Sequence, residues 1–167
     1  NLKIKFRESF RPFAPAVIEE EVSNWFDMKE KSPYMLLVAQ IREEIKNKAN
    51  IKEQENLNGF EKLKLGLSQI PAVTHIDCSA RVQTVNEKKN GKFYKLLQEF
   101  NNKTGCPVLV NTSFNVRGEP IVNTPEDAFN CFMGNKLDIL VIENFFLTKE
   151  KQNKSLIKNY ESNFELD

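Results

Sequence analysis

Hydrophobic and polar residues alternate at the beginning of the chain, over residues 2–7. This period of two is typical of a half-buried strand with one apolar and one cationic face. Asn1 stands directly before this pattern, without a cap or leader, so we expect the chain to have been cut from a longer protein. The predicted apolar face carries Leu2, Ile4 and Phe6, and the cationic face carries Lys3, Lys5 and Arg7.

Further along, the patterns predict a mixture of helices and strands. Helical spacing predicts helices from after Pro15 to about Met28 and over residues 91–104, the second ending at Gly105. Thr124, with Pro125 and Asp127, has the pattern of a capped helix start. Because short strands outnumber helices, we expect an α/β fold with a twisted mixed sheet and packed helices. Strands are predicted at residues 34–41, 80–85, 108–110 and 138–148.

Length and composition suit one soluble domain with a real core, since the chain has 167 residues of which 40% are hydrophobic. We predict a domain over residues 1–148, interrupted by a solvated polar insertion at about 42–69 and followed by a polar tail at 149–167. A weak helix is expected near residues 60–67. The net charge of +1 argues against nucleic acid or a membrane surface as partner. No apolar run approaches the roughly eighteen residues of a membrane span, and no signal peptide is evident, so we expect a cytoplasmic protein.

Several kinds of site are disfavoured by the residues present. The three cysteines form no C-x-x-C pair, which predicts reduced thiols. His75 is the one histidine, and zinc takes at least three protein ligands, so we expect His75 to be a loop or strand-end residue and no metal site. Signatures of P-loop, Rossmann, zincin and serine-hydrolase sites are absent.

The segment from Pro107 to Ala128 combines a predicted strand, a polar turn and a helix start. In α/β proteins, ligands bind where strands deliver polar groups at their carboxyl ends. Ser113 and Asn115 lie two residues apart, so an extended chain presents both side chains on one side, although both residue types also form turns. The polar groups of this segment are Asn111, Thr112, Ser113, Asn115 and Arg117.

Cations supply the other candidate binding groups. The cationic face of the predicted first strand, extended by Arg11, either grips an anion or is a solvated strand face. Arg81 stands in an otherwise uncharged strand-like run, so a buried guanidinium there would bind a ligand or pair with Asp77. Such groups are poor at proton transfer and good at holding phosphates and carboxylates.

Four blocks of the sequence carry a resemblance to a known family. The blocks are K-F-R-E-S-F-R-P-F-A-P at 5–15, S-A-R-V-Q-T-V at 79–85, N-T-S-F-N-V-R-G-E-P-I-V at 111–122 and T-P-E-D-A at 124–128. With these blocks the chain resembles, over roughly residues 3–40 and 70–148, the C-terminal domain of the nodulation and antibiotic-tailoring O-carbamoyltransferases. The resemblance implies a YrdC-like fold that binds ATP and carbamoyl phosphate and forms carbamoyl adenylate. It also implies a separate N-terminal transferase domain, which would hold any metal and transfer the carbamoyl group to a small-molecule hydroxyl acceptor.

The same resemblance implies roles for individual residues. The K-x-R and S-x-N elements of the family match Lys5, Arg7, Ser113 and Asn115, which inherit the catalytic and nucleotide-binding roles. An arginine-containing G-P-R-A-L-G-type block and the metal-binding histidines of the family are missing here. We therefore expect weak nucleotide binding and no complete carbamoyl transfer by this chain alone. Further binding residues implied by the resemblance are Arg11, Arg81, Asn111 and Arg117.

Two other functions remain alternatives. YrdC-like domains can engage RNA, although the near-neutral charge disfavours this. The chain could also be a docking module that only shapes a transferase partner. A surface that faces a partner domain could join two copies into a homodimer when exposed. The acceptor is not specified by these residues.

Overall fold

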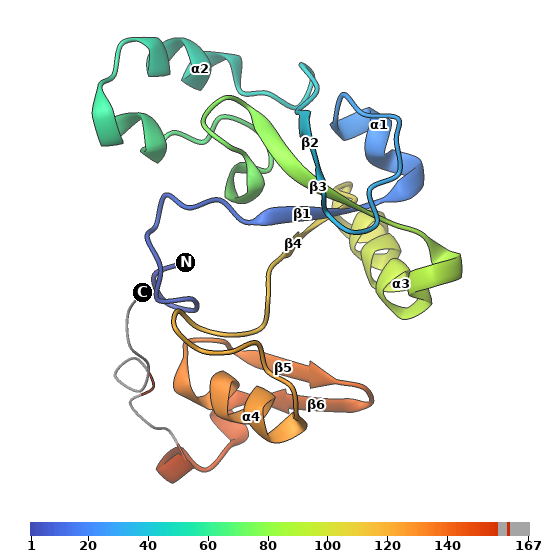
Figure 1. The fold of residues 1–167 in the computed structure, drawn as a ribbon, viewed down its shortest axis with the longest axis vertical. Coiled ribbons are helices and arrows are strands. Elements are labelled where there is room, and N and C mark those ends of the chain that lie inside the picture. The colour runs from blue at the N-terminus through green and yellow to red at the C-terminus, as the bar shows by residue number, and fades with distance from the viewer. Residues whose placement is uncertain (157–159, 161–167) are drawn as a thin grey trace. The chain divides into compact units, whose positions relative to one another are not determined.

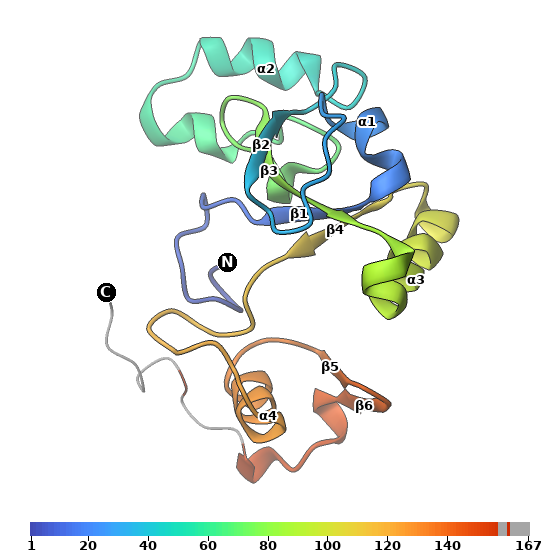
Figure 2. The same ribbon diagram turned by 45° about the vertical axis from the view of Figure 1, so that its right-hand side comes forward.

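The computed structural model describes residues 1–156 and 160 and has an α/β fold, as the sequence predicts (Figures 1 and 2). The chain forms two compact units. One is continuous and consists of residues 12–112. The other combines residues 1–11 with the chain from Ser113 onward. The predicted domain boundary at residue 148 stays a prediction.

The continuous unit is built on a mixed sheet of four strands in the order β2-β3-β1-β4. β1 is parallel to β3 and antiparallel to β4, while β2 is antiparallel to β3. The mixed sheet expected from the sequence is therefore confirmed. Its strands are β1 (Ala14–Ile18), β2 (Leu37–Gln40), β3 (Ser79–Val85) and β4 (Val108–Asn111).

Both faces of β1 are buried, because apolar residues pack against the sheet on each side of this strand. Ala16 and Ile18 pack on one side with Leu97 of α3 (Glu87–Thr104), and Val17 packs in the cluster on the other side. The helix predicted after Pro15 is therefore wrong over its first part. A strand buried on both faces has no polar alternation, so periodicity cannot distinguish it from a helix. Only α1 (Val22–Trp25) is α-helical there, after a 3-10 turn at Glu19–Glu21.

The helix predicted at residues 91–104 is confirmed as the main part of α3. It begins earlier, where the Asn86 side chain accepts a hydrogen bond from the Lys89 amide at 3.0 Å. The helix is interrupted at Asn90, whose φ of −128° is not helical. It ends at Gly105 with a φ of 74°, a left-handed conformation that glycine adopts without steric cost.

The two edge strands of the sheet are partly exposed. The strand predicted at 108–110 is present as β4, but Val110 is 48% exposed because β4 is an edge strand. The predicted strand at 34–41 is shortened to β2.

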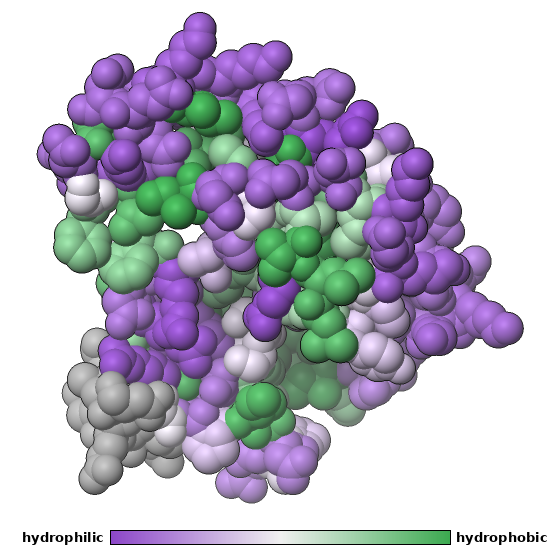
Figure 3. Space-filling model, turned by 45° about the horizontal axis from the view of Figure 1, so that its top comes forward, coloured by the Kyte–Doolittle hydropathy of each residue, from purple (hydrophilic) through white to green (hydrophobic). Residues whose placement is uncertain are grey.

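On the face drawn in Figure 3, hydrophilic residues surround smaller apolar patches. The polar insertion contains α2 (Lys48–Glu55), which the sequence did not predict, and a 3-10 helix at Gly59–Lys64 near the expected weak helix.

In the second unit, α4 (Pro125–Gly134) packs on a β-hairpin (Figures 1 and 2). The single strand predicted at 138–148 is wrong. Glu143, with a φ of 52°, turns the chain between the antiparallel strands β5 (Ile139–Ile142) and β6 (Phe145–Thr148). Leu140 and Leu147 contact Phe132 of α4, so α4 covers one face of the hairpin.

Within the described residues, none of the helices has the length and apolar character to cross a membrane.

The predicted cap of α4 is present and yields a test of local stability. The Thr124 hydroxyl accepts from the Asp127 amide at 3.1 Å, and the Asp127 carboxylate accepts from the Thr124 amide at 3.0 Å. Replacing Thr124 by Ala should lower the free energy of unfolding by about 1 kcal/mol. Thr124→Ser keeps the hydroxyl and should therefore retain most of the parent protein's free energy of unfolding. Urea unfolding measures this free energy for both variants. If both variants lost the same amount, the hydroxyl would not stabilise the helix.

Candidate functional site

The first residues of the chain form a turn rather than the predicted strand, and their burial does not follow the predicted apolar and cationic faces. Leu2 is 65% exposed, whereas Lys5 is only 2% exposed. Phe6 has a φ of 51°, which breaks the extended conformation that alternation requires. The segment therefore directs the ammonium group of Lys5 into its unit.

Lys5 is buried against the loop that follows β4. Its Nζ donates to the Ser113 carbonyl at 2.6 Å and to the Asn115 Oδ1 at 2.9 Å. The Ser113 hydroxyl donates to the same Asn115 oxygen at 2.7 Å. The side chains of Ser113 and Asn115 therefore meet, as their spacing predicts, but in a loop that they help to form. The structure thus brings together Lys5, Ser113 and Asn115 from distant parts of the sequence.

Burial gives the Lys5 amine an unusual proton affinity. Desolvation, and then the neighbouring positive charge of Arg7, lower the pKa of Lys5 from 10.5 to about 8. Since the unfolded chain binds the proton more tightly, Lys5 favours the folded state increasingly as the pH rises from about 8 to 10.5. Below pH 8 the group is an ammonium with three N–H bonds. Two of them have protein acceptors among the described residues, so the third can donate to an anion.

Glu119 holds this loop in place by hydrogen bonds to Asn115 and Val116. Its carbonyl accepts from the Asn115 Nδ2 at 2.7 Å, and its carboxylate accepts from the Val116 amide at 2.8 Å and from the Tyr160 hydroxyl. Burial, and then Glu119, raise the pKa of the Cys131 thiol to about 12, so this thiol is unreactive at neutral pH. The sequence indicated no role for Glu119 or Tyr160, although Glu119 belongs to one of the blocks that carry the resemblance.

The arginines near this loop differ in their ion pairs. The guanidinium of Arg117 lies 3.4 Å from the Glu8 carboxylate, and that of Arg11 lies 3.9 Å from it. Arg7 is partly exposed and has no ion pair in the described part of the chain. Partly exposed pairs contribute little stability, so a ligand anion can compete with Glu8. Within the described residues, no carboxylate competes in this way for the guanidinium of Arg7.

Two predicted site residues, Arg81 and Asn111, belong to the continuous unit. Arg81 is exposed, and Asp77 instead accepts from the amide and hydroxyl of Ser79 at 3.0 and 2.7 Å. The expected buried guanidinium and its pairing with Asp77 are therefore wrong. Arg81 faces outward because Val82 and Thr84 occupy the buried side of β3. Asn111, at the end of β4, donates to Gln83.

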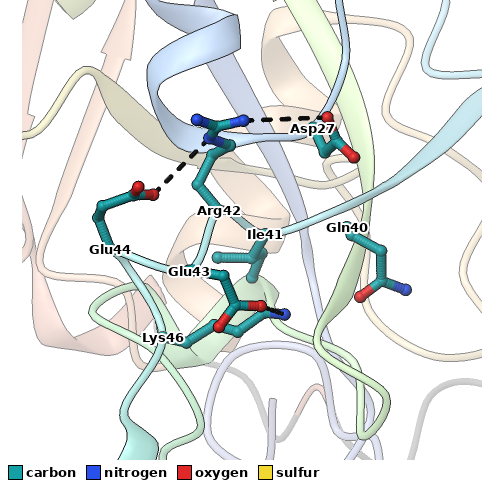
Figure 4. A pocket seen from close by; sticks show the side chains of 7 residues that line it. All are labelled: Asp27, Gln40, Ile41, Arg42, Glu43, Glu44 and Lys46. Atoms are coloured by element: carbon teal, nitrogen blue, oxygen red, sulfur yellow. Dashed lines mark hydrogen bonds and ion pairs between the residues drawn. The ribbon is translucent and has the colours of Figure 1, made fainter.

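The continuous unit also has a surface hollow of about 350 Å³, shown in Figure 4. Its cations are engaged by neighbouring carboxylates: Arg42 lies 4.0 Å from Asp27 and 3.7 Å from Glu44. Lys46 lies 2.6 Å from Glu43. This balance of charges makes the hollow a weaker candidate for anion binding than the surroundings of Lys5.

Potential metal ligands do not gather in the part of the chain that the structure describes, where no group of three or more His, Cys, Asp or Glu suits an ion. His75, between β2 and β3 in the sequence, forms a hydrogen bond with the Ser79 hydroxyl at 2.9 Å. This is a local structural role for the histidine, in a loop as the sequence predicts.

Comparison with known proteins places these residues in context. A family model described as carbamoyltransferase C-terminus matches residues 1–149. An uncharacterized protein of Synechocystis is 55% identical over 168 residues, covering all of this chain and 27% of the relative. Nodulation protein NolO of Bradyrhizobium diazoefficiens is 36% identical over 152 residues, or 89% of this chain and 24% of the relative.

A third relative carries the name of an enzyme. The 3'-hydroxymethylcephem-O-carbamoyltransferase of Amycolatopsis lactamdurans is 35% identical over 125 residues, or 75% of this chain and 20% of the relative. The chain spans about a quarter of the length of the curated relatives it matches. The matches lie in their C-terminal parts.

The depressed pKa of Lys5 is directly testable. In ¹³C- and ¹⁵N-labelled protein, the side-chain resonances of Lys5 should titrate with a midpoint near pH 8. Lys31, whose pKa is raised by its hydrogen bond to Glu19, serves as the control and should titrate above 10.5 in the same spectra. The Lys5→Arg variant identifies the resonance. A Lys5 midpoint at the ordinary lysine value would show that the ammonium is solvated rather than buried.

Proposed function

The chain belongs to the carbamoyltransferase C-terminal family, and from this premise we propose that it is the domain of an O-carbamoyltransferase that binds ATP and carbamoyl phosphate. The product would be carbamoyl adenylate. By atom balance its formation consumes one water and releases phosphate and pyrophosphate. The remainder of a longer protein would transfer the carbamoyl group to a small-molecule hydroxyl, and we place this activity in the cytoplasm.

The buried Lys5 ammonium, held by Ser113 and Asn115, is the observation that carries the proposal. ATP and carbamoyl phosphate are both polyanions, so bringing them into contact requires cations and donors that offset their repulsion. The third N–H of Lys5 is such a group, and so is the guanidinium of Arg7, which has no ion pair among the described residues. Charge-assisted hydrogen bonds to phosphate oxygens are among the strongest in proteins.

The loop around Ser113 supports a binding role for a second reason. Its polar side chains hold Lys5 before any ligand arrives, so little rearrangement is needed when an anion binds. Arg117 is tied to this arrangement, because its amide donates to the Lys5 carbonyl at 3.0 Å. The guanidinium of Arg117 can then exchange its contact with Glu8 for a phosphate.

The acceptor site is proposed to lie outside this chain. The chain corresponds to about a quarter of the curated relatives it matches. The carbamoyltransferase among them is named for action on a hydroxymethylcephem; we infer only that a hydroxyl acceptor is the class of substrate. This chain alone is expected to activate the carbamoyl group at most. Detectable carbamoylation of an acceptor by the isolated chain would contradict this division of labour.

Ligand binding should depend on Arg7 and Ser113. Calorimetric titration of the chain with ATP or carbamoyl phosphate should give saturable binding, which Arg7→Ala weakens about tenfold or more by removing a charged donor. Ser113→Ala should weaken it less, because it removes one donor to Asn115 while keeping the carbonyl contact with Lys5. Arg42→Ala, a paired arginine in the continuous unit, is the matched control and should bind as the parent chain does.

Three results would contradict the proposal. Equal affinity of the Arg7→Ala and Arg42→Ala variants would exclude the Lys5 region as the site. Salt-sensitive binding of RNA without saturable binding of either small ligand would identify a nucleic-acid module instead. Binding of neither ligand nor RNA would leave docking to a transferase partner as the role of this domain.

A further inference from the structure

Tyr160 is a buried aromatic residue in a polar part of the sequence. It lies beyond residue 149, where the match to the family model ends, yet it is only 8% exposed. Its ring belongs to a cluster with Val116 and Cys131. A residue of the tail is thus packed into the unit that contains Lys5.

Gly134, the last residue of α4, provides the space for this ring. A Cβ atom built on Gly134 would overlap the side chain of Tyr160 at three of its carbon atoms. The overlap involves the ring at its attachment to the backbone, which cannot move aside as the far end of a flexible side chain can. The glycine therefore forms a cradle that fits the tyrosine, independently of the hydrogen bond made by its hydroxyl.

The hydroxyl of Tyr160 reaches the loop that holds Lys5. It donates to one carboxylate oxygen of Glu119, while the other oxygen accepts from the Val116 amide. The Glu119 carbonyl accepts from the Asn115 amide group, and Asn115 accepts from Lys5. A continuous series of hydrogen bonds therefore runs from Tyr160 through Glu119 and Asn115 to the Lys5 ammonium.

We propose that Tyr160 is a positioning residue for the anion site, which holds the loop from Ser113 to Glu119 in the conformation that presents Asn115 to Lys5. The proposal rests on the proposed binding of ATP and carbamoyl phosphate at Lys5. Tyr160 does not touch the ligand itself. It acts through Glu119, and so extends the functional part of the chain past the region that the family model matches.

The hydroxyl, and not only the ring, is required for this role. A tyrosine that merely filled a hollow could be replaced by phenylalanine with little effect, since the two rings have nearly the same shape. Here the hydroxyl donates to one oxygen of a partly buried carboxylate, and loss of this donor weakens the hydrogen bonding that holds the carboxylate in place. The effect should therefore reach the atoms that Glu119 holds, which are the Val116 amide and the Asn115 side chain.

The test compares Tyr160→Phe with Tyr34→Phe, in which the tyrosine is 76% exposed. Tyr160→Phe should speed hydrogen exchange of the Val116 amide and weaken binding of carbamoyl phosphate or ATP, each about three- to tenfold. Water admitted around Lys5 should also move its titration midpoint upward from about pH 8. Tyr34→Phe should change none of the three. Gly134→Ala, which fills the cradle, should act in the same direction as Tyr160→Phe.

The readouts separate the two proposals. If the parent chain binds neither ligand, the proposed function fails, but amide exchange at Val116 and the Lys5 midpoint still test the role of Tyr160. If the parent chain binds its ligands and Tyr160→Phe leaves exchange, midpoint and affinity unchanged, the positioning role is overturned. A loss of thermal stability in Tyr160→Phe without any change at Val116 or Lys5 would equally overturn it, because the residue would then be structural only.

Discussion

A buried ammonium group must be given acceptors, and in this protein that requirement joins the two ends of a discontinuous unit. Removing a charge from water is unfavourable unless its hydrogen bonds are replaced. Lys5 finds its acceptors 108 and 110 positions away in the sequence. The N-terminal residues thereby become part of the same unit as the loop after β4, and the arrangement of Asn115, Glu119 and Tyr160 follows from serving that one cation.

Interactions that span three or four residues could be predicted from the sequence, and those that depend on distant neighbours could not. The cap at Thr124 and the glycine end of α3 were predicted because each is complete within one turn of chain. The alternation at residues 2–7 predicted a strand, but nothing local indicates that Lys5 has acceptors in a remote loop. β1 was predicted as the beginning of a helix for a related reason, since its burial on both faces depends on α3 on one side and on the apolar cluster around Val17 on the other.

The residues of the candidate site also differ in whether a local sequence pattern reveals them. Lys5, Ser113 and Asn115 were singled out by spacing and by resemblance, and the structure places them in contact. Arg81 was misjudged because an uncharged run does not reveal which side of a strand faces water. Tyr160 was missed because a single aromatic residue in a polar tail has no pattern around it. Its importance becomes visible only beside Gly134, whose missing side chain is itself meaningful only in three dimensions.

Because this unit is discontinuous in the sequence, its parts are synthesised at different times. The unit of residues 12–112 is contiguous, so it can fold as soon as it has emerged, as domains generally do during synthesis. Residues 1–11 are made before this unit, but the described acceptors of the Lys5 side chain lie beyond residue 112 and become available only once that part has been made. Lys5 is therefore made before the unit of residues 12–112 and enclosed by residues made after it, and a nascent chain that stalled before Ser113 would leave its ammonium in solvent.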